Sequence, residues 1–310
     1  MIKITSDIIK EKIFDLGIEG ELINFRSLSI TPASIFSPIN EGLYFDMTGN
    51  LESKVKNSFI IANTYERNIE NCNIYFLTNQ NVQVIFYKLL SELFPEKSTG
   101  KISQQSIIDP EAEIGENVQI DPFCVIGKVK IEDDVIIKNN CHIHDNSYIS
   151  VGTIIEPMSV IGARGMAWIW NENQTEKIIQ PQLGGVIVGK YCILGANTIA
   201  VRGSLSEKTI IGDYTMMAPG CRLGHGSVIG EYVHFANNVV TGGNTKIGDY
   251  CFIGSSATFR PKVEIGKKTI VGAGANVVKN NSDEGVTLVG NPARAMQTSE
   301  NPSGMPKPKK

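Results

Sequence analysis

The stretch LGHGSVIGEYVHFANNVVTGGNTKIGDYCFIGSSATFRPKVEIGKKTIVGAGANV, residues 223–277, decides the fold because an apolar residue returns at every sixth position. The full series at this phase is Ile211, Met217, Leu223, Ile229, Phe235, Thr241, Ile247, Ile253, Phe259, Ile265, Val271 and Val277. All of these except Thr241 are apolar, whereas about 45% of the residues of an average protein are. A run of this length at one phase indicates a structural repeat.

A period of six excludes the two commonest regular structures. An α-helix repeats every 3.6 residues and a flat strand every two, so neither keeps each sixth side chain on its inner side. A triangular coil with three short strands per turn does. Glycine follows many repeat residues, as at Gly212, Gly230 and Gly248, and we expect it at corners whose backbone angles other residues resist. We therefore predict a mainly β protein, a prism of parallel coils stacked about 4.8 Å apart.

The prism is predicted to span residues 105–296. Its first part carries the same period from Ile108 to Ile161, with a one-residue phase slip after Ile126. The period then vanishes, and we expect residues 163–184 to form a loop ejected from the prism. Because a single prism leaves much apolar surface open, side-by-side packing of three copies is the usual completion, and we expect a homotrimer.

Residues 1–100 lack the hexad and indicate a small α/β domain, which we expect to bind the acceptor substrate. Its predicted elements are helices at Asp7–Leu16 and Val82–Leu93 and apolar, strand-like runs at Asn57–Ala62 and Cys72–Thr78. At the other end, residues 297–310 are rich in Pro, Ser and Lys and predict a disordered tail.

The composition excludes several classes of protein. A net charge of -3 favours binding neither to nucleic acid nor to an anionic membrane. No apolar stretch of 18 residues occurs and the amino terminus lacks a signal-peptide core, so we expect no stable membrane insertion. The six cysteines form no C-x-x-C pair, which favours reduced thiols in the cytoplasm. His142 and His144 suit a metal in spacing, but a third ligand is missing, so no metal is predicted.

Two histidines are the candidates for a base that works near neutral pH. His225 and His234 both lie off the inward column, so both are expected to point outward or toward a neighbouring subunit. Their separation of nine residues is half a coil of 18, which places them on different faces of one prism. In a trimer, His225 of one chain can then share a cleft with His234 of the next.

Gly243 lies one full coil after His225 and can offer its backbone N–H as an oxyanion donor. His225 would take a proton from an amine or hydroxyl as that group attacks a thioester carbonyl. The plainer alternatives are a surface or interface histidine and a corner glycine. For Trp168 and Trp170, in the ejected loop, the alternatives are an anchor for the loop and a platform for a ligand.

The layout of the chain resembles the hexapeptide-repeat acyltransferases, above all the UDP-3-O-acylglucosamine N-acyltransferases of lipid A synthesis. The similarity includes the amino-terminal domain, the prism, the ejected loop and its return in IQPQLGGVIVG at 179–189. GANTI at 195–199, followed by Arg202-Gly203, extends it. The resemblance implies a left-handed parallel β-helix. In that family the catalytic histidine lies in a hexad matching Arg222-Leu223-Gly224-His225, which carries the role of base to His225.

The carboxy-terminal third is also similar to acetyl-CoA-dependent amino-sugar N-acetyltransferases. In these enzymes the base aligns with His225, a histidine on the coenzyme A side aligns with His234, and the oxyanion glycine aligns with Gly243. The ending at Gly290–Met296 is shared with many members that use coenzyme A. The residues implied to bind acetyl-CoA, or another short acyl-CoA, are His234, Gly243, Gly272, Pro292 and Arg294.

For the acceptor, GLYF at 42–45 resembles the lipid A enzymes, although their N-x-K-Y continuation is not reproduced. The residues predicted to bind substrate are Phe45, Trp168, Trp170 and Asn237. The prolyl-lysyl ending differs from the helical extension that those enzymes use with acyl carrier protein, so acyl-CoA is the expected donor. We predict an N-acyltransferase acting on a nucleotide-linked amino sugar for a surface polysaccharide. The alternatives are the lipid A reaction with hydroxyacyl carrier protein and a non-catalytic β-helix scaffold.

Overall fold

The computed structural model describes residues 2–48, 51, 54–64, 71–78 and 80–296, and the predicted tail at 297–310 lies outside them. The chain divides into two compact units, Met1–Glu96 and Lys97–Lys310. The expectation from sequence had placed this division at residues 100–105. Each unit has its own hydrophobic core, so each is described by itself.

The first unit is a six-stranded sheet in the order β1-β3-β4-β5-β6-β2, with two helices. The four central strands, β3 to β6, run parallel and the two outer ones antiparallel. The elements are β1 (Ile4–Thr5), α1 (Ser6–Asp15), β2 (Glu21–Ile23), β3 (Ser29–Pro32), β4 (Gly42–Asp46), β5 (Phe59–Ala62), β6 (Asn73–Phe76) and α2 (Val82–Leu93).

Both helices begin at a side-chain cap. The Thr5 hydroxyl accepts the Ile8 N–H before α1, and the Asn81 side chain accepts the Val84 N–H before α2. The helix α2 packs on β4 and β5 and buries Phe86 and Leu89 against the sheet. This packing positions the aromatic residues that form a cavity described below.

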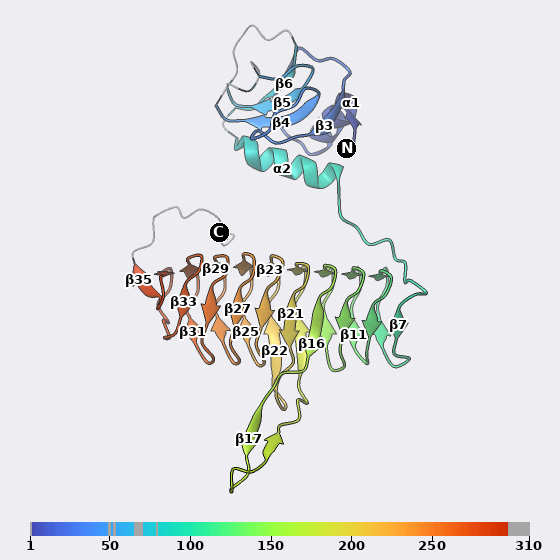
Figure 1. The fold of residues 1–310 in the computed structure, drawn as a ribbon. Coiled ribbons are helices and arrows are strands. Elements are labelled where there is room, and N and C mark those ends of the chain that lie inside the picture. Colours follow the sequence, from blue (N-terminus) through green and yellow to red (C-terminus); the bar gives the residue numbers. More distant parts are fainter. Residues whose placement is uncertain (1, 49–50, 52–53, 65–70, 79, 297–310) are drawn as a thin grey trace. The chain divides into compact units, whose positions relative to one another are not determined.

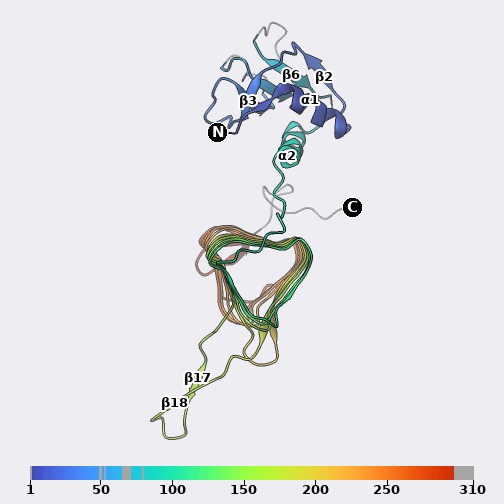
Figure 2. The same cartoon turned by 90° about the vertical axis from the view of Figure 1, so that its right-hand side faces the viewer.

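The second unit is a prism with three flat faces, which Figure 2 shows nearly along its axis. Its strands pair in parallel from coil to coil. The first face consists of β7 (Ile107–Ile108), β10 (Val125–Ile126), β13 (His142–Ile143), β16 (Val160–Ala163), β21 (Ile199–Val201), β24 (Arg222–Leu223), β27 (Val240–Thr241), β30 (Thr258–Phe259) and β33 (Asn276–Val277).

The second face consists of β8 (Glu113–Ile114), β11 (Lys130–Ile131), β14 (Tyr148–Ile149), β19 (Gly185–Val188), β22 (Lys208–Ile211), β25 (Val228–Ile229), β28 (Lys246–Ile247) and β31 (Glu264–Ile265). The third face consists of β9 (Gln119–Ile120), β12 (Ile136–Ile137), β15 (Ile154–Ile155), β20 (Ile193–Leu194), β23 (Met216–Met217), β26 (His234–Phe235), β29 (Phe252–Ile253), β32 (Ile270–Val271), β34 (Thr287–Val289) and β35 (Arg294–Met296). Within this face, β35 is antiparallel to β34 and closes the sheet.

The repeat residues form the core of the prism. Every position of the series from Ile211 to Val277 is at most 5% exposed. Its one polar member, Thr241, is buried without penalty because its hydroxyl accepts the Gly224 N–H at 3.1 Å and lies 3.2 Å from the Ser227 hydroxyl. The phase slip has a structural counterpart, since the coil from Ile126 to Ile143 is one residue shorter than the coil from Ile108 to Ile126.

The predicted reason for the repeat glycines is wrong. Gly212, Gly230 and Gly248 do not have positive φ; the left-handed residues lie two positions later, as at Tyr214 (φ 57°) and Tyr232 (φ 54°). Glycine is needed instead because successive coils approach closely. A Cβ on Gly212 would lie 2.5 Å from the carbonyl carbon of Gly230, which no real side chain tolerates.

The segment between β16 and β19 leaves the prism, as Figure 1 shows. It is a two-stranded antiparallel hairpin of β17 (Trp168–Trp170) and β18 (Lys177–Ile179). The sequence predicts an ejected loop over 163–184, and this segment does leave the prism, with a hairpin as its structure. Among the described residues, no helix is both long enough and apolar enough to cross a bilayer.

Candidate active site

His225 lies at the corner where the chain leaves the first face after β24. Leu223 is buried in the core and anchors this corner. Gly224 lets the next coil come close, because a Cβ there would lie 2.6 Å from the Gly243 nitrogen. Gly226 then turns the chain with a φ of 64°. The imidazole is therefore held outside the prism, and His225 is half-buried.

Gly243 lies directly beside this imidazole on the next coil. β24 pairs with β27, and the Asn244 N–H donates to the His225 carbonyl at 2.7 Å. A Cβ built on Gly243 would lie only 2.3 Å from His225 Nε2, so the ring packs against the glycine itself. The structure thus brings together the predicted base and the predicted oxyanion residue.

The Gly243 N–H is an unused donor. Within the part of the chain that the structure describes, it donates to no acceptor, although Gly243 is buried. An unpaired N–H in a buried residue costs free energy unless water or a ligand accepts it. A ligand oxygen beside His225 Nε2 would remove that cost.

The other ring nitrogen of His225 faces Ser204. The Ser204 hydroxyl lies 3.0 Å from Nδ1, and Ser204 is only 8% exposed. Sequence reasoning missed this residue, because it lies in the irregular segment between β21 and β22, outside the hexad series. Its spacing of three residues from Glu207 is the one available signal, since Glu207 accepts the backbone N–H of Ser204 at 2.6 Å.

Arg202 follows β21, on the coil that precedes that of His225. The Arg202 Nε–H donates to the Gly162 carbonyl at 2.7 Å, which fixes the guanidinium at this corner. Two coils before that of Arg202, the rings of His142 and His144 stack with their centres 4.0 Å apart. Burial lowers the pKa of His144, and the nearby charges of His142 and Arg202 lower it further.

His234 lies on a different face from His225 in the same chain. It occupies β26 on the third face, where its ring stacks on Phe252 at 5.2 Å. Burial lowers the pKa of His234. Asn237 follows at the corner beyond β26 and is exposed.

Of the other residues predicted to bind coenzyme A, Gly272, Pro292 and Arg294 lie along the third face with His234, whereas Gly243 lies beside His225. Gly272 directly follows β32, and a Cβ there would lie 2.9 Å from Val289 Cγ1 on β34. Pro292 lies in the turn before β35, and Arg294 lies in β35; both are exposed. Within one chain, this group is therefore separated from the corner that holds His225 and Gly243.

Trp168 and Trp170 lie on the hairpin and are 43% and 46% exposed. Their rings meet edge to face at 5.2 Å. The Lys177 ammonium lies 4.3 Å from the centre of the Trp168 ring and 5.4 Å from that of Trp170. The hairpin thus carries a cation–π cluster on its own strands, away from the core of the prism.

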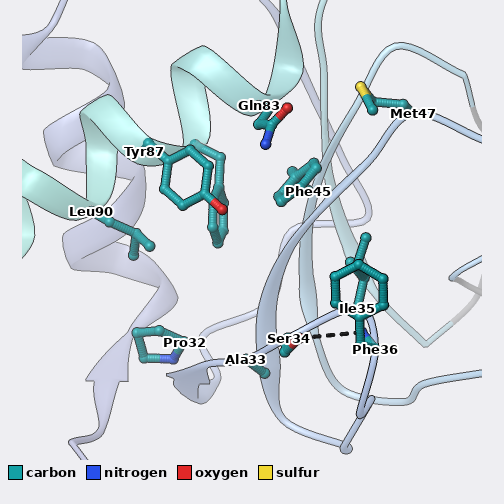
Figure 3. Close-up of a pocket in the computed structure, with 11 residues that line it drawn as sticks. Pro32, Ala33, Ser34, Ile35, Phe36, Phe45, Met47, Gln83, Tyr87 and Leu90 are labelled. Carbon is teal, nitrogen blue, oxygen red and sulfur yellow. Dashed lines mark hydrogen bonds between the residues drawn. The ribbon is translucent and has the colours of Figure 1, made fainter. Parts of the chain in front are cut away.

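Phe45 lines a cavity of the first unit, which Figure 3 shows. The cavity has a volume of about 530 Å³ and is bounded by β4, α2 and the segment after β3. Phe45 contacts Phe86 and Tyr87 with ring centres 5.1 and 6.0 Å apart. Gln83 and Ser34 supply polar groups at its wall. An aromatic cavity with few polar groups suits a flat, partly polar ligand.

The repeat matches a known family of repeats in bacterial transferases. The Bacterial transferase hexapeptide (six repeats) family matches residues 111–145 and 244–279. A UDP-3-O-acylglucosamine N-acyltransferase of Coxiella burnetii is 33% identical over 190 residues, 51% of this chain and 54% of that protein. UDP-3-O-acylglucosamine N-acyltransferase 1 of Francisella tularensis is 29% identical over 157 residues, 44% of each chain. The chain thus spans about half the length of these curated relatives.

Solved structures show the same architecture. A UDP-N-acetylglucosamine acyltransferase is 28% identical, with a TM-score of 0.57 over 63% of this chain and 73% of the other. The corresponding protein of Bacteroides fragilis is 25% identical, with a TM-score of 0.57 over 63% and 74%. These matches agree with the resemblance seen in the sequence. The chain therefore carries the hexapeptide repeat of the bacterial transferases, and its second unit is a left-handed parallel β-helix like that of the UDP-N-acetylglucosamine acyltransferases.

Proposed function

We propose that this protein is an acyltransferase that acylates the amine of a nucleotide-linked amino sugar. The observation that carries the proposal is the pairing of His225 Nε2 with Gly243, whose N–H lacks an acceptor among the described residues. A base and an oxyanion donor at one point are what acyl transfer from a thioester needs.

His225 and Gly243 together account for the proton transfer and the developing charge of the proposed reaction. The acceptor amine attacks the thioester carbonyl, and His225 Nε2 takes the proton that the nitrogen loses. The carbonyl oxygen becomes an oxyanion, which the Gly243 N–H stabilises. The C–S bond then breaks, and the imidazolium returns its proton to the leaving thiolate. The products are an amide and a free thiol, with His225 restored to its neutral form.

The names of the relatives bear on the acceptor. They favour UDP-3-O-acylglucosamine, the acceptor of lipid A synthesis, over another amino sugar of a surface polysaccharide. Arg202, fixed on the coil beside His225, would suit the diphosphate of such a nucleotide. Within the first unit, taken by itself, the aromatic cavity around Phe45 would suit a flat ring, and its volume matches a small ligand.

The donor distinguishes two forms of the proposal. A relative from Chlamydia caviae, 32% identical over 126 residues (40% of this chain and 42% of that protein), is named for an acyl carrier protein donor. Acetyl-CoA, the donor first expected from the sequence, is supported by the resemblance of the Gly290–Arg294 turn to enzymes that use coenzyme A. The names of these relatives concern UDP-linked glucosamine, and the lipid A reaction on that acceptor uses a hydroxyacyl carrier protein. We therefore propose the carrier protein as the donor ahead of acetyl-CoA.

We further propose that the active unit is a homotrimer. The outward residues of the third face are mostly apolar, and those of the first face are apolar apart from His142, Arg222, Thr258 and Asn276. The second face also presents Ile187, Ile210 and Val228, but it carries the ion pairs Lys130–Glu113 and Lys246–Glu264. Apolar outward residues are Val125, Val160, Ile199 and Val240 on the first face and Ile154, Ile193, Met216, Phe252 and Ile270 on the third. Packing the third face of one chain on the first face of the next would place His234 near a neighbour's His225 and close the ring.

The function is tested by incubating the purified protein with UDP-3-O-acylglucosamine and either a hydroxyacyl carrier protein or acetyl-CoA, with products measured by mass spectrometry. We expect amide formation, and a loss of about 10²–10⁴-fold in rate for His225→Ala. His142→Ala, which removes a histidine of the first face three coils away, is the matched control and keeps the rate. Absence of transfer from both donors, or full activity of His225→Ala, would contradict the proposal; the first result is the one expected of a non-catalytic scaffold.

A further inference from the structure

A hydrogen-bonded chain leads away from His225 on the side opposite Gly243. The Ser204 hydroxyl lies 3.0 Å from Nδ1, while Nε2 packs over Gly243. One ring nitrogen is therefore occupied by the protein, and the other packs against Gly243. Which nitrogen carries the proton of the neutral ring decides whether His225 can act as a base there.

Glu207 holds Ser204 from the far side. Its two carboxylate oxygens accept the backbone N–H groups of Ser204 and Leu205, at 2.6 and 2.9 Å. The Leu205 N–H is the main cause that lowers the pKa of Glu207, and hydrogen bonds from Ser204 lower it further. Glu207 is thus a carboxylate, which only accepts hydrogen bonds. The Ser204 hydroxyl can therefore donate a hydrogen bond to Glu207, which leaves the lone pairs of the hydroxyl oxygen free to accept one from the His225 ring.

We propose that Ser204, oriented by Glu207, is a positioning residue that fixes His225 in the tautomer with its proton on Nδ1. The Nδ1–H donates to Ser204 Oγ, so Nε2 is left bare beside Gly243 and is ready to accept a proton. When Nε2 becomes protonated, Nδ1–H keeps the same hydrogen bond and the imidazolium is stabilised. The catalytic meaning of this arrangement rests on the proposed acyltransferase function, whereas the tautomer itself does not.

The hydroxyl of Ser204 is not needed to hold its own segment. The backbone there is fixed by other bonds: the Leu183 N–H donates to the Ser204 carbonyl at 2.9 Å, and the Gly184 N–H to the Gly203 carbonyl at 3.1 Å. Removal of the hydroxyl therefore leaves the local fold in place. This separates the role of the side chain from that of the backbone, and makes Ser204→Ala an interpretable variant.

The test uses the full-length protein with 15N-labelled histidine and compares Ser204→Ala with Ser204→Thr, which keeps a hydroxyl. The ring nitrogen shifts of His225, assigned by their loss in His225→Gln, are expected to show the Nδ1–H tautomer in the wild type and in Ser204→Thr. In Ser204→Ala the Nε2–H tautomer is expected to gain population. In the acyl-transfer assay Ser204→Ala should lose about tenfold in kcat at unchanged KM, the value of about one hydrogen bond. The acid limb of its pH profile should move to lower pH, because the imidazolium loses a hydrogen-bond acceptor.

The outcomes separate the inference from the function beneath it. If the wild type transfers no acyl group, the proposed function fails, but the tautomer measurement still decides the role of Ser204. If His225→Ala abolishes transfer while Ser204→Ala keeps the wild-type tautomer and pH profile, the function stands and the inference is overturned. A Ser204→Thr variant that behaves like Ser204→Ala would also overturn it, since the hydroxyl would then not be what orients the ring.

Discussion

Gly243 is the residue of the candidate site at which an added side chain would collide with the imidazole of His225 itself. In Gly243→Ala the new Cβ would lie 2.3 Å from His225 Nε2, so the imidazole must move. Because the displaced group is the end of a side chain, we expect the fold to persist and the acyl-transfer rate to fall by about 10²–10⁴-fold, the value of a general base. The measurements are kcat/KM and the thermal unfolding midpoint.

A control for this variant is Gly285→Ala. A Cβ on Gly285 meets nothing within 4 Å, but its φ of 72° makes alanine cost about 1–2 kcal/mol of stability. The two variants should therefore behave in opposite ways, one losing activity and the other stability. Equal activity in Gly243→Ala and the wild type would show that the ring of His225 is not required where the structure places it.

The half-buried histidine of the third face makes stability depend on pH. Burial lowers the pKa of His234 in the folded chain, so the unfolded chain binds more protons below the ordinary value of about 6.5. The stability present above that value is lost as the pH falls from about 6.5 toward the native pKa. In His234→Phe, which preserves stacking on Phe252, the free energy of unfolding should fall less between pH 7 and 5. An unchanged pH dependence in urea unfolding would contradict this.

The pairing of His225 with Gly243 could be predicted from the sequence, whereas the contact of Ser204 could not. A parallel coil of fixed length places residues 18 apart side by side, so arithmetic alone connects the first pair. Ser204 reaches His225 through an irregular segment held by hydrogen bonds to Glu207 and Gly184. Such a contact depends on the path of the backbone, which no period in the sequence encodes.

At the level of elements, prediction succeeded where a local signal was complete. The helix at Val82–Leu93 forms with the predicted bounds, because its apolar face, its Asn81 cap and Pro95 beyond it agree. The strands β1, β2, β3 and β4 were missed, since they are short and their burial arises from neighbours distant in sequence. The predicted role of the repeat glycines was wrong, because a glycine required for close approach between coils looks the same in the sequence as one required for a positive φ.

Removal of the two tryptophan rings from the hairpin of β17 and β18 should affect binding more than folding. Its rings contact one another and Lys177, and the core of the prism contains none of its residues. In the double variant Trp168→Ala, Trp170→Ala we expect a change of at most about 0.5 kcal/mol in the free energy of unfolding. If the hairpin holds the acceptor, KM for that substrate rises while KM for the acyl donor stays constant. An acceptor KM equal to the wild type would leave the two tryptophans as anchors of the hairpin alone.

For the whole molecule, the contrast between the faces predicts how copies assemble. Each face has an outward apolar residue of similar exposure. These residues are Met216 on the third face (44% exposed), Val240 on the first (36%) and Val228 on the second (38%). Glutamate at each adds the same charge, but only Met216→Glu and Val240→Glu would bury it in the proposed interface, where an unpaired charge is costly. We expect these two variants to dissociate and to lose transfer activity, while Val228→Glu keeps the mass and activity of a trimer. Light scattering after size exclusion measures this, and a monomeric wild type, or equal dissociation of all three variants, would refute the assignment of the faces.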